Sequence, residues 1–238
     1  MRESNNQLLC GLEPVAWATL SQNGRRMELA KGDALYEMGA PLGYVYFPET
    51  AVLAVAAETL AGESVNVALV GEEGVVGAFE ACGSRQTFTR VTAQIPGTIW
   101  RVPATAYREA FGVSSGLRNQ IHRYIEMLLV EARQFVACNA LHTVENRLAR
   151  SLLDAHDRAR STSLSLTQDA LAQLLGVQRT TIAAAISTLQ REGLLRSGRG
   201  MVELVNLAGL ERASCSCRQT VAYARREIQA SPAEPCEA

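Results

Sequence analysis

Residues 166–192, with the sequence LTQDALAQLLGVQRTTIAAAISTLQRE, constrain the fold of this chain more than any other stretch. Apolar residues recur at a helical period on both sides of Gly176, a residue suited to the left-handed turn that ends a helix. Thr167 is a good N-cap for the first helix, because its hydroxyl can accept from free backbone N–H groups. The second helix starts near Gln178 and has one apolar stripe, formed by Ile182, Ala185, Ile186 and Leu189. The stretch therefore predicts two helices joined by a tight turn.

The outer face of the second helix suits the major groove of DNA. At about 100° per residue, small, hydroxyl and arginine side chains point away from the apolar stripe, and no acid occurs before Glu192. Such a helix can enter a major groove without steric or charge conflict. We interpret the stretch as a helix-turn-helix and expect DNA contacts from Thr167, Gln168, Gln178, Arg179, Thr180, Thr181, Ala184, Ser187 and Arg191.

Two neighbouring features favour a winged helix-turn-helix over an ordinary helical hairpin. After the second helix, residues 193–205 form two short apolar runs around Gly198-Arg199-Gly200, the pattern of a β-hairpin wing. Residues 178–226 contain eight arginines and three glutamates, a net charge of +5, although the whole chain carries −1. A local basic surface is what phosphate binding needs. We expect Arg199, in the wing, to contact DNA as well.

The helix-turn-helix with its glycine-tipped wing resembles the DNA-binding domain of the Crp/Fnr superfamily of bacterial transcription regulators. The resemblance covers nearly all of the chain up to about Leu210. It implies that Arg179 bonds guanine O6 and N7, while phosphate contacts come from Thr167, Gln168, Thr181 and Arg199. The family's usual glutamate is Thr180 here, and its second arginine is replaced by Ala183 or Ala184. Because these changes leave methyl groups that favour thymine, we predict a site that differs from the TGTGA-type half-site.

Residues 27–102 consist of short apolar runs separated by turn residues at spacings of about 8–12, which indicates a β-sandwich or barrel. The resemblance implies a double-stranded β-helix, or jelly roll, of the cyclic-nucleotide-binding kind. A β scaffold that binds no ligand is the alternative. We expect an α+β chain with four parts: a β-roll sensory domain at 1–113, a dimerisation helix and hinge at 114–141, a winged helix-turn-helix at 142–227, and a disordered tail at 228–238.

The ligand-binding residues of the β-roll depart from those of cyclic-AMP-binding members. The family holds the ribose with a glutamate after a glycine, and the phosphate with an Arg-Ser or Arg-Thr pair. Here Ala78 follows Gly77, and Thr87-Phe88 stand where the pair is expected. If the alignment with the family is shifted, Arg85 or Arg90 comes near a phosphate. Even then, both members of the Arg-Ser or Arg-Thr pair are not brought there together. We therefore expect no useful affinity for cyclic AMP, and the sequence leaves any other effector unknown.

The helical period returns from Ser114 to about Asn139. The apolar stripe of this helix is longer than is needed to cover one face of a β-roll. In the family this helix pairs with its twin across a two-fold axis. Two recognition helices contact two half-sites, which a single helix cannot do. The alternative is a helix that only covers its own β domain. We expect the dimer contacts to be Leu117, Ile121, Tyr124, Leu128, Ala132 and Phe135.

The cysteine pattern favours no metal and no cofactor, with a redox or metal role of Cys215 and Cys217 as the open alternative. Six cysteines are scattered along the 238 residues, and only Cys215 and Cys217 are close in sequence, without further ligands at matching spacing. An iron–sulfur sensor of the Fnr kind carries several cysteines near its N-terminus, where this chain has only Cys10. No apolar run is long enough to span a membrane, and the first residues lack a secretory pattern, so we expect a cytoplasmic protein.

Together these features predict a homodimeric, sequence-specific DNA-binding transcription regulator that is not an enzyme. Its expected partners are double-stranded DNA and a second copy of the chain, with RNA polymerase as a further candidate. A nucleotide- or protein-binding module that does not touch DNA is one alternative. An enzyme that uses Cys138 and His142, which lie one helical turn apart, is another.

Overall fold

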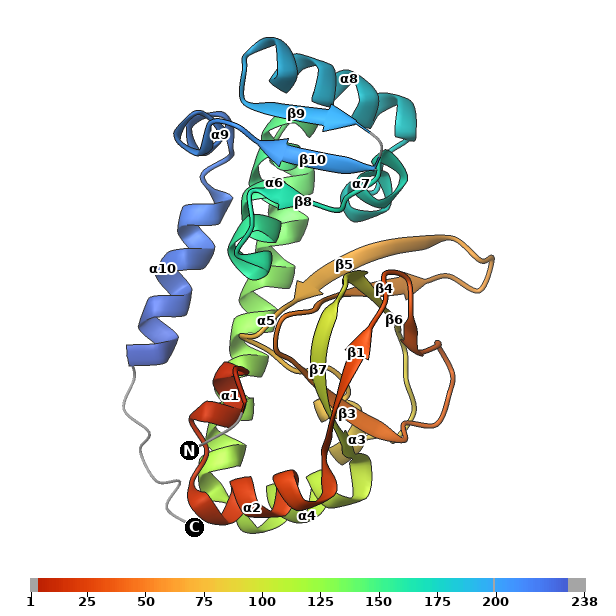
Figure 1. Cartoon of the computed structure of the whole chain (residues 1–238), viewed down its shortest axis with the longest axis vertical. Coiled ribbons are helices and arrows are strands. Elements are labelled where there is room, and N and C mark those ends of the chain that lie inside the picture. The colour runs from red at the N-terminus through yellow and green to blue at the C-terminus, as the bar shows by residue number, and fades with distance from the viewer. Residues whose placement is uncertain (1–3, 199, 231–238) are drawn as a thin grey trace.

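The computed structural model describes residues 4–198 and 200–230, built around one long central helix (Figure 1). This helix, α5 (Ser115–Leu141), begins where the Ser114 hydroxyl accepts a hydrogen bond from the Leu117 N–H at 3.0 Å. The β-rich domain lies beside its lower half, and the helix-turn-helix lies at its upper end. Beyond His142, which leaves the helical conformation, Thr143 caps the next helix. The helical conformation is therefore interrupted at His142 and Thr143.

The N-terminal domain contains two antiparallel sheets. One has the order β1-β7-β3 and the other the order β2-β6-β4-β5. Apolar side chains from both sheets, including Leu53, Val91 and Ile99, form a common core between them. The predicted β-roll is thus confirmed. Its strands are β1 (Arg25–Leu29), β2 (Ala34–Tyr36), β3 (Tyr44–Pro48), β4 (Val52–Glu58), β5 (Ser64–Val70), β6 (Arg90–Ile95) and β7 (Gly97–Pro103).

Short helices close the lower end of this domain against the first half of α5 (Figure 1). They bury a second apolar core, in which Phe47 and Tyr107 pack with their ring centroids 6.4 Å apart. Leu117 and Ile121 of α5 belong to the same core and are almost completely buried. These helices are α1 (Gln7–Cys10), α2 (Pro14–Asn23), α3 (Ala78–Cys82) and α4 (Ala104–Val113).

The C-terminal domain is a winged helix-turn-helix. Thr167 caps the first helix of the motif by accepting from the Ala170 N–H at 3.1 Å, and Gly176 ends it with φ of +61°. The order of the three-stranded wing sheet is β8-β10-β9. The predicted motif is confirmed, and its elements are α6 (Val144–Ala159), β8 (Ser163–Leu164), α7 (Gln168–Leu175), α8 (Arg179–Arg191), β9 (Leu195–Gly198), β10 (Met201–Leu204) and α9 (Leu207–Ala213).

The core of this domain continues into the β-rich domain. Val52, Ala54 and Leu69, from β4 and β5, pack into the same apolar cluster as the helix-turn-helix core. The Lys31 ammonium adds a polar contact, because it donates to the Ser165 backbone oxygen at 2.7 Å. Apolar burial therefore holds the two domains together.

A last helix, α10 (Cys217–Ala230), runs beside α5 (Figure 1). Residues 228–230 belong to it, so the start of the predicted disordered tail is helical instead. Arg225 explains this extension, because its guanidinium pairs with the Glu131 carboxylate of α5 at 2.7 Å. The rest of the predicted tail, residues 231–238, lies outside the described residues. Among the helices of the described part of the chain, none combines the length and apolar character needed to cross a bilayer.

Candidate nucleic-acid interface

Helix α8 lies at the outer end of the molecule (Figure 1), and it has one buried and one exposed face. The buried face is the predicted one, consisting of Ile182, Ala185, Ile186 and Leu189. The residues expected to contact DNA lie on the other side, where all six of these side chains are exposed: Arg179, Thr180, Thr181, Ala184, Ser187 and Arg191. Gln178, the residue before the helix, is exposed as well, while Thr167 and Gln168 are half-buried at the start of α7. The fold thus collects the expected side chains on one surface.

Arg179 extends from the first turn of α8. Its side chain is 65% exposed, and its Nε lies 3.6 Å from the carboxylate of Asp169, which is equally exposed on α7. An exposed ion pair of this kind contributes at most about 1 kcal/mol. Arg179 can therefore leave Asp169 for a stronger partner at small cost.

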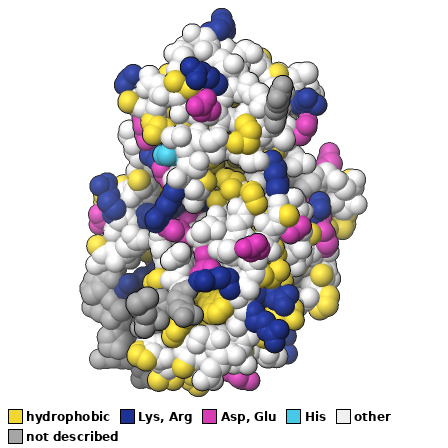
Figure 2. Space-filling view, viewed as in Figure 1, with side chains coloured by type: hydrophobic (Ala, Val, Ile, Leu, Met, Phe, Trp, Pro, Cys, Tyr) yellow, Lys and Arg dark blue, Asp and Glu magenta, His cyan; other side chains and the backbone are white. Residues whose placement is uncertain are grey.

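The wing adds positive charge beside α8. Arg196 of β9 is directly opposite Glu203 of β10, and its guanidinium lies 3.7 Å from that carboxylate while remaining 75% exposed. Arg196 is one of the eight arginines of residues 178–226, but it is not among the DNA contacts expected from the sequence. Figure 2 shows Lys and Arg side chains spread over the upper part of the molecule, which carries α8 and the wing. Arg199, which is expected from the sequence to contact DNA, lies outside the described residues.

The predicted dimer contacts on α5 fall on different faces of the helix. Leu117, Ile121 and Tyr124 are buried in the chain's own core, and Leu128 packs against that core. Phe135 faces Arg150, whose guanidinium carbon is 5.7 Å from the ring centroid. Of the six residues named from the sequence, only Ala132 is exposed. In the single chain, the strongest part of the apolar stripe therefore covers the β-rich domain.

A second apolar stripe on α5 is open. Leu129 is 49% exposed and Val136 is 70% exposed. With the half-buried Ile125 and the exposed Ala132, they follow a 4-3-4 spacing, which places all four on one side of the helix. Helix α10 packs on the opposite side, through Glu131 and Gln134. α5 therefore has one face on its β domain, one on α10 and one uncovered.

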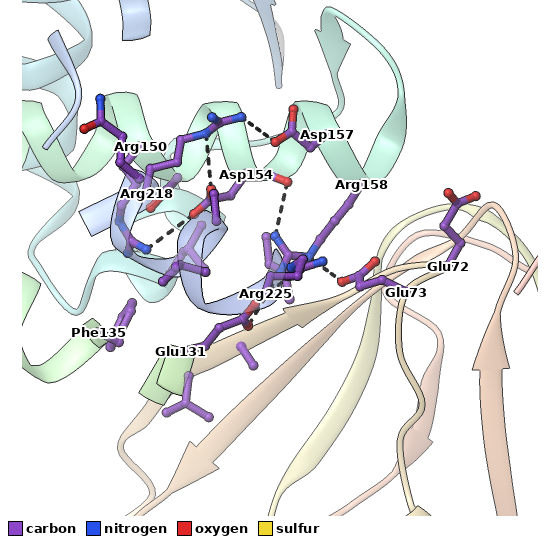
Figure 3. Close-up of a pocket in the computed structure, with 18 of the residues that line it drawn as sticks. Glu72, Glu73, Glu131, Phe135, Arg150, Asp154, Asp157, Arg158, Arg218 and Arg225 are labelled. Atoms are coloured by element: carbon purple, nitrogen blue, oxygen red, sulfur yellow. Dashed lines mark hydrogen bonds and ion pairs between the residues drawn. The ribbon is translucent and has the colours of Figure 1, made fainter. Parts of the chain in front are cut away.

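A cavity of about 560 Å³ lies where the β-rich domain, α5, α6 and α10 meet (Figure 3). Arg158 of α6 projects into it and lies 2.8 Å from Glu73, which follows β5, and 3.7 Å from Glu131 of α5. The side chains of Arg158 and Glu73 are only 13% and 14% exposed. One arginine thus links three parts of the fold.

The same junction extends along α10. Arg218 forms ion pairs with Asp157 of α6 and, at 2.9 Å, with Glu211 of α9. Its Nε also lies 3.7 Å from Asp154 (Figure 3). These contacts connect the DNA-binding domain with the C-terminal helix.

Burial and charge act in opposite directions on the acids of this junction. Burial works to raise the pKa of Glu73, but the Arg158 guanidinium and two backbone N–H groups outweigh it, so the pKa is lowered. At Asp154, burial outweighs the three neighbouring arginines, so the pKa is raised. For Arg158, the surrounding carboxylates overcome the effect of burial and raise the pKa. Glu73 and Arg158 therefore remain a charged pair at neutral pH.

The residues at the positions of the family's cyclic-AMP contacts are buried, already bonded to other groups of the chain, or exposed to solvent. Ala78 is buried and offers only a methyl group. The Thr87 hydroxyl donates to the backbone oxygens of Glu37 and Ala40, and the side chain is buried. Phe88 is 64% exposed, and Arg90 pairs with Glu37 at 3.0 Å. The structure therefore brings neither the acid nor the Arg-Ser pair to this position.

Cys138, proposed with His142 as a catalytic pair in the enzyme alternative, lacks the exposure and the low pKa of a nucleophilic thiol. Cys138 is completely buried, and its sulfur lies 3.5 Å from that of Cys215. Burial raises the pKa of the Cys138 thiol to about 12, so little thiolate is present at neutral pH. The contact with Cys215 was not foreseen from the sequence, because 77 residues separate the two cysteines.

Comparison with known proteins agrees with this geometry. Residues 146–213 match the model of the Crp-like helix-turn-helix domain. The transcriptional regulator SdrP of Thermus thermophilus is 33% identical over 101 residues, which cover 40% of this chain and only half of SdrP. The transcriptional regulatory protein btr of Bordetella pertussis is 26% identical over 200 residues, covering 79% of this chain and 80% of btr.

The fold of most of the chain has counterparts among solved structures. A CRP/FNR-family transcriptional regulator of Thermus thermophilus superposes with a TM-score of 0.67 at 23% identity, covering 80% of this chain and 98% of that one. Likeness at this identity concerns the fold, whereas the match over residues 146–213 concerns the sequence of the DNA-binding domain itself. The chain therefore carries a Crp-like helix-turn-helix domain at residues 146–213, within a fold that it shares with a solved CRP/FNR-family regulator.

Proposed function

We propose that this protein regulates transcription by binding a two-fold symmetric DNA site as a homodimer, without control by cyclic AMP. The observation that carries the proposal is the open face of α8, on which Arg179, Thr180 and Ala184 are all exposed. A second copy supplies the other recognition helix, so that two half-sites about 34 Å apart are bound together. Because chromosomal DNA is its partner, the protein acts in the cytoplasm, where RNA polymerase is a further candidate partner.

The open stripe of α5 supports the homodimer. Leu129, Ala132 and Val136 recur at the spacing of a coiled-coil seam, and a symmetric copy of the same stripe is apolar at the same positions. Ala132 is small, which allows two helix backbones to approach closely. This assignment moves the proposed seam away from Leu117, Ile121 and Tyr124, which are buried in the single chain.

A direct test of the function is recovery of bound fragments from a pool of genomic DNA. The recovered fragments should share a symmetric motif. A module that binds only nucleotides or proteins would recover no shared motif, which would refute the proposal.

Replacement of Arg179 should reduce both affinity and specificity. Arg179→Ala removes the guanidinium proposed to bond guanine O6 and N7, so we expect a loss of about 1–3 kcal/mol in binding free energy and a relaxed preference at one base pair. Fluorescence anisotropy with the recovered site and its single-base-pair variants measures both effects.

Arg196→Ala provides a matched control, because Arg196 is another exposed arginine, in the wing. This substitution should weaken binding to all sequences alike and reduce the slope of log affinity against log salt by about 1. Arg199→Ala should do the same. If Arg179→Ala and Arg196→Ala behave identically, the proposed role of Arg179 in base recognition is wrong.

Cyclic AMP should not bind with useful affinity. Ala78 cannot hold the ribose hydroxyl, and the Thr87 hydroxyl is already bonded to two backbone oxygens. Isothermal titration calorimetry on the reduced protein should therefore give no saturable heat at micromolar concentrations. A dissociation constant in the micromolar range or tighter would contradict this prediction.

A further inference from the structure

Three cysteines from distant parts of the chain meet in one buried cluster. Cys138 lies near the end of α5, while Cys215 and Cys217 lie between α9 and the first turn of α10. All three side chains are buried, and their sulfur atoms lie within 4.8 Å of one another. Cys10 and Cys82, by contrast, are exposed. The fold therefore concentrates thiols at one point and does not distribute them through its cores.

The spacing of the sulfurs fits a single metal ion. With zinc–sulfur bonds of about 2.3 Å, two thiolates on one tetrahedral ion lie about 3.8 Å apart. The Cys138 and Cys215 sulfurs are 3.5 Å apart, and the third sulfur is within 4.8 Å of both. Shifts of about 1 Å or less would bring all three to bonding distance. An iron–sulfur cluster fits less well, because sulfurs that bind different irons lie further apart than sulfurs that share one ion.

The surroundings of the cluster suit bound thiolates. A divalent ion with three thiolates carries a net charge of −1, and the buried arginines Arg147 and Arg150 both interact electrostatically with Cys138. Each of these arginines has a buried Nε without a hydrogen-bond partner among the described residues. The Gln134 side-chain amide also donates to the Cys217 sulfur at 3.1 Å. Such outer contacts orient metal ligands and stabilise their charge.

We propose that Cys138, Cys215 and Cys217 form a binding site for one thiophilic divalent ion of the zinc class. Soft sulfur ligands favour such an ion over magnesium or calcium. The thiols release their protons to the solvent as the ion binds. The bound ion ties the end of α5 to the segment that connects the DNA-binding domain with α10, and so stabilises the contact between them. The site exists independently of any DNA sequence that the protein recognises.

Titration of the reduced, metal-free protein tests the site directly. Zn²⁺ in competition with a chromogenic chelator should bind at one ion per chain and raise the melting temperature. Cd²⁺ should produce a thiolate-to-metal charge-transfer band with the same stoichiometry. Cys138→Ser, Cys215→Ser and Cys217→Ser should each weaken binding by about 100-fold or more, while Gln134→Met, which removes only an outer contact, should weaken it by about 10–100-fold.

Two further cysteine variants serve as matched controls. Cys82→Ser removes an exposed thiol outside the cluster, and Cys236→Ser removes the C-terminal thiol that lies outside the described residues. Both should bind Zn²⁺ like the parent protein. Circular dichroism establishes that each variant is folded, and if Cys138→Ser is not, the Cys215 and Cys217 variants decide the question.

Three outcomes would overturn the proposal. The first is the absence of stoichiometric Zn²⁺ or Cd²⁺ binding by the reduced protein. The second is full binding by Cys215→Ser and Cys217→Ser. The third is formation of a Cys138–Cys215 disulfide under mild oxidation by a protein that binds no metal when reduced, which would identify the pair as a redox site instead.

Discussion

Arg158→Met should destabilise the protein by about 3 kcal/mol, because breaking one side of a buried ion pair leaves an uncompensated charge. Arg158 lies between Glu73 and Glu131 and is only 13% exposed. Methionine keeps much of the length of the side chain but none of its charge, so the Glu73 carboxylate loses its nearest cation. Glu131 retains Arg225, at 2.7 Å. Urea unfolding monitored by circular dichroism should show a lower midpoint.

Arg160→Met is the matched control for this prediction. Arg160 lies two residues further along and pairs with Glu72, but its side chain is 73% exposed. The loss of such a surface pair should cost less than about 1 kcal/mol. If the two variants lose the same amount of stability, burial does not distinguish the two ion pairs. The prediction that the buried pair of Arg158 stabilises the fold more would then be wrong.

The effect of Arg158→Met should also depend on pH. Since Arg158 lowers the pKa of Glu73 in the folded protein, their pair contributes stability above the ordinary value of 4.5, and that contribution is lost as the pH falls through the lowered value. The difference in unfolding free energy between the parent protein and Arg158→Met should therefore become smaller below about pH 4. The raised pKa of Asp154 acts with the opposite sign, because the folded state loses stability as this buried carboxyl ionises.

Local features of the sequence were sufficient to predict the helix-turn-helix. Thr167, Gly176 and the stripe that contains Ile182 and Ile186 each depend on neighbours within about two helical turns, and the structure places them as expected. The β-roll was predicted from the same kind of local signal, with strands alternating with turn residues. The sequence also provided reason to doubt that the β-roll binds cyclic AMP, because the family's motif specifies the residue type at each ligand contact.

Features that depend on distant contacts could not be predicted in the same way. The period of α5 shows that Leu117 and Ile121 are buried, but not whether a second chain or the same chain buries them. In the structure their own β-rich domain does so. Likewise, Cys138 lies on a helix far in sequence from Cys215 and Cys217, so only the tertiary fold shows the thiol cluster. The ion pairs that join α10 to α5 and α6 also link residues far apart in the sequence, so the sequence alone did not reveal them.

The other large effect is expected at the open stripe of α5. The double variant Leu129→Glu, Val136→Glu places two carboxylates in each helix at the centre of the proposed seam, where a symmetric partner brings two more. Burying these charges without partners is costly, so the dimer should dissociate. Analytical ultracentrifugation at micromolar concentration should find a dimer of the 25.7 kDa chain for the parent protein and a monomer for the variant.

DNA binding should weaken together with the dimer. Linked recognition helices gain affinity because the second half-site is bound at a high effective concentration, a gain of about 10²- to 10⁴-fold. The double variant should lose that factor on the full symmetric site and lose little on an isolated half-site. Leu60→Glu, which makes the same kind of change at a fully exposed position in the turn between β4 and β5, should alter neither mass nor affinity. A folded double variant that remains dimeric would show that the two copies associate through another surface.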